Sequence, residues 1–293
     1  MVTRRWVLGW AVVLGLGAPM LASGAEPPAL VTHEQVRKRL SDKALRLLDV
    51  RPRADYEKGH IPGAVSVDTK GASALASKPG GLSDQAAWGA WVEPLGIADG
   101  QEVLVYGGKS PIEAARVWWL LRYLGAERVG LIDGGFPLWA AGNRPVSSEA
   151  TAVAPGKFRV RLDRGRLATK EDVLAALKSG SETVVDARSV GEYTGSDKSS
   201  KRGGHVPSAC RVEWSDLIDG EGRFLAEATL RSKFGKAGVK AGGPVITHCQ
   251  GGGRASLDAF VLERLGFPTR NYYLGWSDWG NVEETPVAEG EKP

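Results

Sequence analysis

Cysteine and histidine are scarce in this sequence, which holds 2 Cys and 4 His among 293 residues. So few ligands leave no room for a framework of several zinc ions or iron–sulfur clusters, and two Cys cannot staple a disulfide-rich scaffold. The net charge is only +4, which gives no reason to expect a nucleic acid partner. Apolar residues (42%) and charged residues (25%) occur at ordinary globular shares, which excludes a disordered chain.

Long apolar runs are also rare, and the clearest one lies near the N-terminus. Arg4 and Arg5 precede the uncharged run Trp6–Leu21, which is followed by the small residues 22–25. This pattern predicts a secretory signal peptide over residues 1–25 and an exported protein of the bacterial periplasm. The run is short for a membrane span, so we expect no stable membrane insertion after cleavage. The paired arginines also hint at the twin-Arg export route.

The remaining chain contains one unit twice. Four motif pairs recur in the same order: Asp49-Val50-Arg51 with Asp186-Ala187-Arg188, Gly59-His60-Ile61-Pro62 with Gly204-His205-Val206-Pro207, Val103–Tyr106 with Val245–His248, and Gly134-Gly135-Phe136 with Leu274-Gly275-Trp276. A period of roughly 140 residues indicates duplicated domains rather than a solenoid. The segment Val146–Lys157 is rich in Ala, Ser and Pro. We therefore expect domains over 26–147 and 161–293, joined by a linker over 148–160.

Short apolar runs alternate with helical patterns in each half. Strands are predicted at Leu45–Val50, Val103–Tyr106, Thr183–Asp186 and Val245–His248. Thr32 with Gln35 forms a capping box before one helix, and Thr169 has the matching place in the second half. The alternation predicts an α/β fold, with a mainly parallel sheet flanked by helices in each half. We expect five tryptophans to pack in the interior: Trp118, Trp119, Trp139, Trp276 and Trp279.

One loop carries the candidate chemistry. Cys249 follows the predicted strand, and Gly251, Gly252 and Gly253 lead into a helix from about Arg254 to Leu265. Such a loop places the thiol over a helix N-terminus, where unpaired N–H groups favour an anion. Three glycines let successive N–H groups point inward as a nest. We expect an accessible, ionised thiol at Cys249 rather than a buried structural one.

At this loop and at the repeated motifs, the sequence resembles the tandem-domain rhodanese family of sulfurtransferases, which includes thiosulfate and 3-mercaptopyruvate sulfurtransferases. The resemblance covers nearly the whole chain after residue 25. It implies two tandem rhodanese-like domains, of which only the C-terminal one keeps the Cys, and here Gly107 stands where Cys249 stands in the repeat.

The resemblance also implies a reaction. Cys249 would take sulfur from a small anionic donor, thiosulfate or 3-mercaptopyruvate, and pass it from a persulfide to a thiol or to cyanide. No metal or organic cofactor is required, and the oligomeric state stays open. The positions that match the family's substrate-binding residues are Arg188, Gln250, Gly251, Gly252, Gly253 and Arg254. Gln250 and Gly251 fit neither the thiosulfate nor the mercaptopyruvate pattern, which leaves the donor undecided.

Several polar residues are interpreted as supports. His248 and Cys249 are neighbours on a strand and point to opposite faces, so we do not expect a catalytic dyad. His60 and His205, and Asp49 and Asp186, occur in both halves and are expected to brace loops. Arg254 could instead pair with Glu263. Glu192 and Asp197 receive no role.

Other interpretations remain for the two thiols. Cys210 is expected to be a core thiol, although a disulfide with Cys249 is conceivable in an oxidising compartment. The Cys249 loop also looks like that of a Cys-dependent phosphatase, but only residues 250–253 separate Cys249 from Arg254, one fewer than phosphatases have. A non-catalytic periplasmic sulfur carrier is the remaining alternative.

Overall fold

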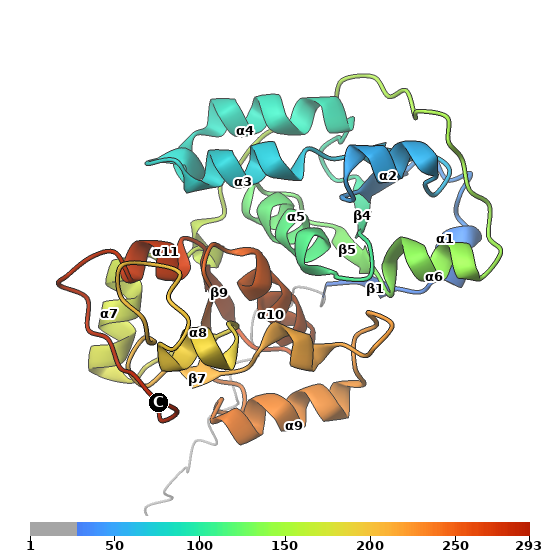
Figure 1. Ribbon diagram of the computed structural model, residues 1–293. Coiled ribbons are helices and arrows are strands. Elements are labelled where there is room, and N and C mark those ends of the chain that lie inside the picture. The colour runs from blue at the N-terminus through green and yellow to red at the C-terminus, as the bar shows by residue number, and fades with distance from the viewer. Residues whose placement is uncertain (1–27) are drawn as a thin grey trace, which may run out of the picture.

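Two parallel sheets organise the chain (Figure 1). The computed structural model describes residues 28–293, so the predicted signal peptide lies outside the described residues. The first sheet has the order β1-β5-β4-β2-β3 and contains β1 (Leu30–Val31), β2 (Leu45–Asp49), β3 (Ala64–Ser66), β4 (Glu102–Tyr106) and β5 (Val129–Ile132). The second has the order β7-β6-β8-β9 and contains β6 (Thr183–Asp186), β7 (Cys210–Arg211), β8 (Val245–His248) and β9 (Thr269–Tyr272).

Helices cover both faces of each sheet, as the alternating pattern predicts. In the first half they are α1 (His33–Arg37), α2 (Arg53–Lys58), α3 (Thr69–Ser77), α4 (Gln85–Val92), α5 (Ile112–Tyr123) and α6 (Gly135–Ala141). In the second half they are α7 (Lys170–Ser179), α8 (Val190–Thr194), α9 (Glu227–Ala237), α10 (Gly253–Arg264) and α11 (Gly275–Trp279). Short 3-10 turns lie at Gly81–Ser83, Glu93–Leu95, Arg164–Arg166 and Trp214–Leu217. The predicted α/β architecture is confirmed.

Local sequence signals account for several helix starts. Both capping boxes form: the Thr32 side chain accepts from the N–H of Gln35, and the Thr169 side chain accepts from the N–H of Asp172. Each side chain satisfies a helix N–H that would otherwise lack a partner.

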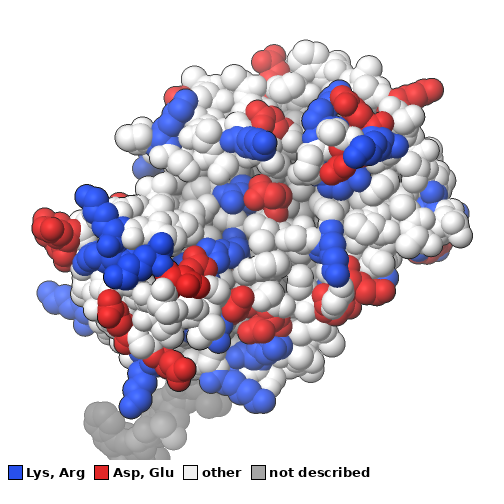
Figure 2. All heavy atoms as spheres, viewed as in Figure 1, with Lys and Arg blue, Asp and Glu red and all other residues white. Residues whose placement is uncertain are grey.

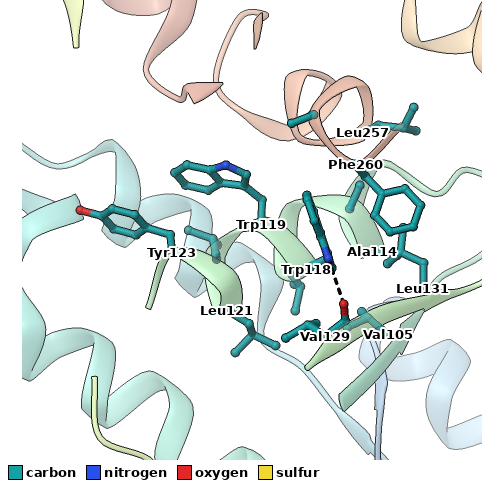
Figure 3. Close-up of a cluster of buried hydrophobic side chains, with 14 of the residues drawn as sticks. Val105, Ala114, Trp118, Trp119, Leu121, Tyr123, Val129, Leu131, Leu257 and Phe260 are labelled. Atoms are coloured by element: carbon teal, nitrogen blue, oxygen red, sulfur yellow. Dashed lines mark hydrogen bonds between the residues drawn. The ribbon is translucent and has the colours of Figure 1, made fainter. Parts of the chain in front are cut away.

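The two halves share one apolar core along α5 and α10. The rings of Trp118 on α5 and Phe260 on α10 meet edge to face with centroids 5.0 Å apart. Figure 3 shows Phe260 beside Trp118, whose Nε1 donates to the carbonyl oxygen of Val129 at 3.1 Å. All five tryptophans predicted to pack are fully buried. Apolar contacts between α5 and α10 therefore cross the boundary between the halves.

An irregular segment over 143–163 connects the halves and lies against the first one. The N–H of Thr151 donates to the Tyr56 hydroxyl at 3.1 Å, and the N–H of Gly156 donates to the carbonyl oxygen of Glu93 at 2.8 Å. No helix of the described residues is long and apolar enough to cross a bilayer.

Candidate active site

Cys249 follows the last residue of β8, and α10 begins four residues later at Gly253. Its side chain packs with Ala187, which follows β6, and with Ala255 in the first turn of α10. We expected an accessible thiol, but Cys249 is only 2% exposed, because these two alanines and the loop close around it. Cys249 and Cys210 are both free thiols, and Cys210 is buried in β7 as expected for a core thiol.

Every carbonyl oxygen of the loop is held by a donor. The oxygens of Cys249 and Gln250 accept from backbone N–H groups of α11, at 2.7 and 3.0 Å. The oxygen of Gly251 accepts from Nη1 of Arg116 at 2.8 Å, and that of Gly252 accepts from the hydroxyl of Ser256 at 2.7 Å. The loop carbonyls thus point towards α11, α5 and α10.

The N–H groups of the same loop are free. Within residues 28–293, the N–H groups of Gln250, Gly251, Gly252 and Arg254 have no hydrogen-bond acceptor. Because C=O and N–H point to opposite sides of a planar peptide group, holding the carbonyls aims the N–H groups of residues 250–252 away from those supports. These free donors and the N-terminus of α10 have the arrangement that the sequence predicts for anion binding.

Two of the three loop glycines have no room for a side chain. Gly252 has φ 83° and a Cβ there would collide with the ring of Tyr273. A Cβ on Gly253 would collide with the guanidinium of Arg116, whereas Gly251 faces open space. The glycine run therefore meets both backbone and steric requirements.

Arg254 forms a bidentate ion pair with Glu192 on α8, at 2.6 and 2.9 Å. The alternative partner, Glu263, instead binds Arg166 at 2.6 Å. Burial alone would lower the pKa of Arg254, but Glu192 and Cys249 hold it above its ordinary value. Glu192, which received no role from sequence, fixes this guanidinium. The sequence signal that could have found Glu192 is its spacing from Ser189: the two residues are three apart and form the capping box of α8.

Gln250 is tied to the segment that follows α8. Its Oε1 accepts from the hydroxyl of Ser199 at 2.6 Å, and its Nε2 donates to the carbonyl oxygen of Ser199 at 3.2 Å. Lys198 and Lys201 in the same segment are exposed. Figure 2 shows Lys and Arg side chains gathered over this part of the catalytic half. The residue after the thiol is thus held at a basic surface.

Arg188 is buried, so its side chain is not exposed to a sulfur donor in solution. Its side chain is 1% exposed, binds Asp186 at 2.6 Å, and donates to the carbonyl oxygen of Gly204 at 2.8 Å. The guanidinium carbon also lies 4.3 Å from the ring centroid of Trp276.

The half without the thiol repeats this arrangement with Arg51. That side chain binds Asp49 at 2.6 Å and the carbonyl oxygen of Gly59 at 2.6 Å, and it lies over Phe136. This repetition favours a structural role for both arginines. A direct contact between Arg188 and the donor stays a prediction.

His248 points to the other side of the sheet from Cys249, as expected. Its Nε2 lies 3.5 Å from Oδ2 of Asp186. The hydroxyl of the neighbouring Thr247 instead donates to the carbonyl oxygen of Ala255 on α10 at 3.1 Å. Burial lowers the pKa of His248 below its ordinary value. Burial alone would raise the pKa of Asp186, but His248 and Arg188 bring it below its ordinary value. The Asp186 carboxylate therefore holds Arg188 after β6 and lies beside His248 at the end of β8. Asp49 holds Arg51 in the same way in the first half.

His60 and His205 also have the predicted structural role. Nδ1 of His60 lies 2.8 Å from the carbonyl oxygen of Tyr56, and the two rings stack. His205 makes the same contacts with Tyr193.

Two functional-site neighbours were missed by sequence reasoning. Asp258 on α10 is fully buried and neither carboxyl oxygen has a hydrogen-bond partner within the described residues. Burial, reinforced by Cys249, raises the pKa of Asp258 well above its usual range. Arg116 comes from α5 in the other half, so no motif near Cys249 could have pointed to it.

Comparisons with known proteins agree with this geometry. The family model described as a rhodanese-like domain matches residues 32–142 and 169–281. The sulfur carrier protein TtuD of Thermus thermophilus is 31% identical over 92% of this chain and 99% of that protein. The thiosulfate sulfurtransferase of Azotobacter vinelandii is 31% identical over 90% and 98%.

Solved structures show the same fold. SseA from Escherichia coli, a 3-mercaptopyruvate sulfotransferase, has a TM-score of 0.73 at 24% identity, over 85% of this chain and 99% of that one. EanB has a TM-score of 0.79 at 22% identity, over 89% of this chain and 69% of that one. With two matched domains and a Cys-bearing loop in the second, this chain belongs to the rhodanese family and is a rhodanese-type sulfurtransferase.

Proposed function

We propose that Cys249 accepts a sulfane sulfur from a small anionic donor and holds it as a persulfide. With thiosulfate, the Cys249 thiolate attacks the outer sulfur. A new sulfur–sulfur bond forms, the bond to the sulfonate sulfur breaks, and its electron pair leaves with sulfite. A thiol or cyanide then attacks the terminal sulfur, and the electron pair of the broken bond restores the thiolate.

The observation that carries this proposal is the polarity of the loop. Its carbonyl oxygens are bound, while N–H groups of Gln250, Gly251, Gly252 and Arg254 are free beside the thiol. Such preorganised donors stabilise the negative charge of a thiolate, of a persulfide and of the arriving donor. The tight packing around Cys249 by Ala187 and Ala255 suits the addition of a single sulfur atom better than a phosphoryl group.

Thiosulfate and 3-mercaptopyruvate are the proposed donors. With 3-mercaptopyruvate the Cys249 thiolate attacks the sulfur, the carbon–sulfur bond breaks, and its electron pair leaves on carbon as the enolate of pyruvate. Relatives named thiosulfate sulfurtransferase support the first, and the fold shared with SseA is compatible with the second. We also propose that the protein is exported, on the basis of the basic, apolar and small-residue pattern in residues 1–25.

A sulfur carrier is a second candidate. The relative TtuD is named as one. A carrier would form the persulfide without sustained turnover.

Intact-protein mass spectrometry tests both candidates. After incubation with thiosulfate, and separately with 3-mercaptopyruvate, we expect a gain of one sulfur that maps to Cys249 and is absent in Cys249→Ala. Continuous thiocyanate production from thiosulfate and cyanide indicates an enzyme, and a single stoichiometric transfer indicates a carrier. If the protein gains no sulfur, or hydrolyses an aryl phosphate at a matching rate, the proposed reaction is wrong.

A further inference from the structure

Arg116 reaches the catalytic loop from the half that has no thiol. Its Nη1 donates to the carbonyl oxygen of Gly251 at 2.8 Å and lies 3.0 Å from the Tyr273 hydroxyl. Its Nε donates to Glu113, one turn earlier on α5, at 3.1 Å. The side chain is 13% exposed. The guanidinium is therefore fixed on both sides, by its own helix and by the partner half.

The fold of the first half does not explain this arginine. Arg116 is the fifth residue of α5, and the fifth residue of the matching helix α10 is the buried Leu257. An apolar residue thus suits this helix position, and burying a guanidinium is costly unless it is well bonded. Its bonds across the boundary are to the catalytic loop and to the ring that packs on Gly252.

The contact controls one of the free N–H groups. Two loop carbonyls are held by backbone groups of α11, which belong to the same half as the loop. Outside the loop itself, the Gly251 carbonyl is held by Arg116 alone among the described residues. Because that carbonyl shares a peptide plane with the N–H of Gly252, Arg116 sets the direction of this donor.

The charge of Arg116 is kept. Burial alone would lower the pKa of Arg116, but Tyr273, Glu113 and Cys249 hold it above its ordinary value. A charged donor binds a carbonyl more strongly and more directionally than a neutral one.

We propose that Arg116 is a positioning residue of the anion receptor: by holding the carbonyl of Gly251 it aims the N–H of Gly252, so the half without a thiol sets the anion affinity of the half that has one. The inference rests on the proposed function for its meaning in catalysis.

The test compares Arg116→Met with Arg122→Met. Arg122 lies on the same helix but binds carbonyl oxygens of its own half, at Ala126 and Glu127, which makes it a matched control. Cys249 is alkylated with iodoacetate, an anion, and with iodoacetamide, which is neutral. The rates at Cys249 are read by peptide mass spectrometry. An intact receptor favours the anion, so the rate ratio measures the receptor without any sulfur transfer.

We expect Arg116→Met to lower the iodoacetate-to-iodoacetamide ratio and to reduce kcat/KM for thiosulfate about 10- to 100-fold, the usual size for a charge-assisted hydrogen bond. Most of the loss should be in KM. Arg116→Lys, which keeps the charge and one donor, should restore part of both quantities, and Arg122→Met should change neither. A merely loosened fold would speed both reagents alike and leave the ratio unchanged.

The outcomes separate the two proposals. If the ratio in Arg116→Met stays within twofold of the wild-type ratio, the positioning role is wrong, even if sulfur transfer is observed. If the ratio falls but the wild-type protein takes no sulfur from any donor, the positioning role holds and the proposed function is wrong.

Discussion

The loops that follow β4 and β8 have the same backbone hydrogen bond, but only the second loop carries a thiol. The carbonyl oxygen of Gly107 accepts from the N–H of Phe136 at 2.9 Å, and the carbonyl oxygen of Cys249 accepts from the N–H of Trp276 at 2.7 Å. A Cβ on Gly107 would lie 3.3 Å from Val50, whereas Cys249 packs against Ala187 at the matching place. The shared hydrogen bond is thus a property of the fold. The catalytic loop differs at two positions: it has Cys249 in place of Gly107, and the smaller Ala187 in place of Val50.

The second difference between the halves is buried polarity. His248, Asp258 and Asn271 each have buried side-chain atoms without a hydrogen-bond partner in the described part of the chain. The matching positions on β4, α5 and β5 hold Tyr106, Val117 and Leu131. Buried polar groups without partners lower stability, and Arg46, His60 and Arg122 of the first half also have such atoms. In the catalytic half, however, His248 and Asp258 lie on β8 and α10, the two elements that flank the Cys249 loop, so this cost falls beside the thiol.

The largest test of this comparison replaces the buried arginine in each half. Arg51→Met and Arg188→Met each leave a buried aspartate without its partner, which should lower the free energy of unfolding by about 3–5 kcal/mol. Urea denaturation measures it. Equal losses, with an unchanged KM for the donor, indicate a structural pair. A raised KM in Arg188→Met alone would restore the substrate-binding role predicted from the sequence, and a loss below about 1 kcal/mol in both would contradict the structural one.

The next test uses glycines of the two loops. Gly252→Ala must adopt a positive φ and displace Tyr273, so we expect a loss of about 10- to 100-fold in kcat/KM for sulfur transfer. Gly251→Ala faces open space and should lose several times less. Gly108→Ala in the first half also faces open space and should leave the melting temperature unchanged. Equal losses in the first two variants would contradict the steric account.

A smaller effect is expected from Asp258→Val, which gives α10 the residue that α5 has at the matching position, Val117. The pKa of Asp258 is raised in the folded protein, so the folded state keeps a proton that the unfolded state has released. Stability should therefore fall as pH rises from the unfolded value towards the folded one. Asp258→Val should raise the free energy of unfolding by about 1–3 kcal/mol at pH 8 and remove this slope. The gain should shrink as the pH falls below 3.8, the ordinary pKa of the unfolded carboxyl, because both states then become protonated. A gain in the free energy of unfolding that does not change with pH would contradict this account of Asp258.

The smallest effect concerns the second thiol. Cys210 lies in β7 as a core residue, so Cys210→Ser should retain sulfur transfer and change the free energy of unfolding by about 1 kcal/mol. Thiocyanate production and thermal melting measure the two quantities. Complete loss of transfer would show that Cys210 takes part in the reaction.

The sequence predicts what is local or repeated. Apolar runs predicted β6 and β8 to the residue, and capping boxes predicted the starts of α1 and α7. The glycines after Cys249 predicted the free N–H groups, because their spacing is a local property of the backbone. Contacts between distant residues could not be predicted: Arg116 with Gly251, and Arg254 with Glu192, depend on how helices of different segments pack.

Burial is the other quantity that local patterns misjudge. Arg188 has the family's position for a substrate contact, but the same dipeptide pattern in the first half places Arg51 in the interior. The repetition was visible in the sequence, and it favours a structural role for this arginine, while its contact with the sulfur donor stays a prediction.

The apolar contact between α5 and α10 ties the chemistry to the integrity of the whole chain. Phe260 and Leu257 are covered by residues of α5, so opening the first half would wet the far side of the helix on which the reactive loop rests. Heat or denaturant should consequently disassemble both halves in one cooperative event. A protease cut within residues 143–163 would leave the two pieces associated, since each supplies the other's missing interior.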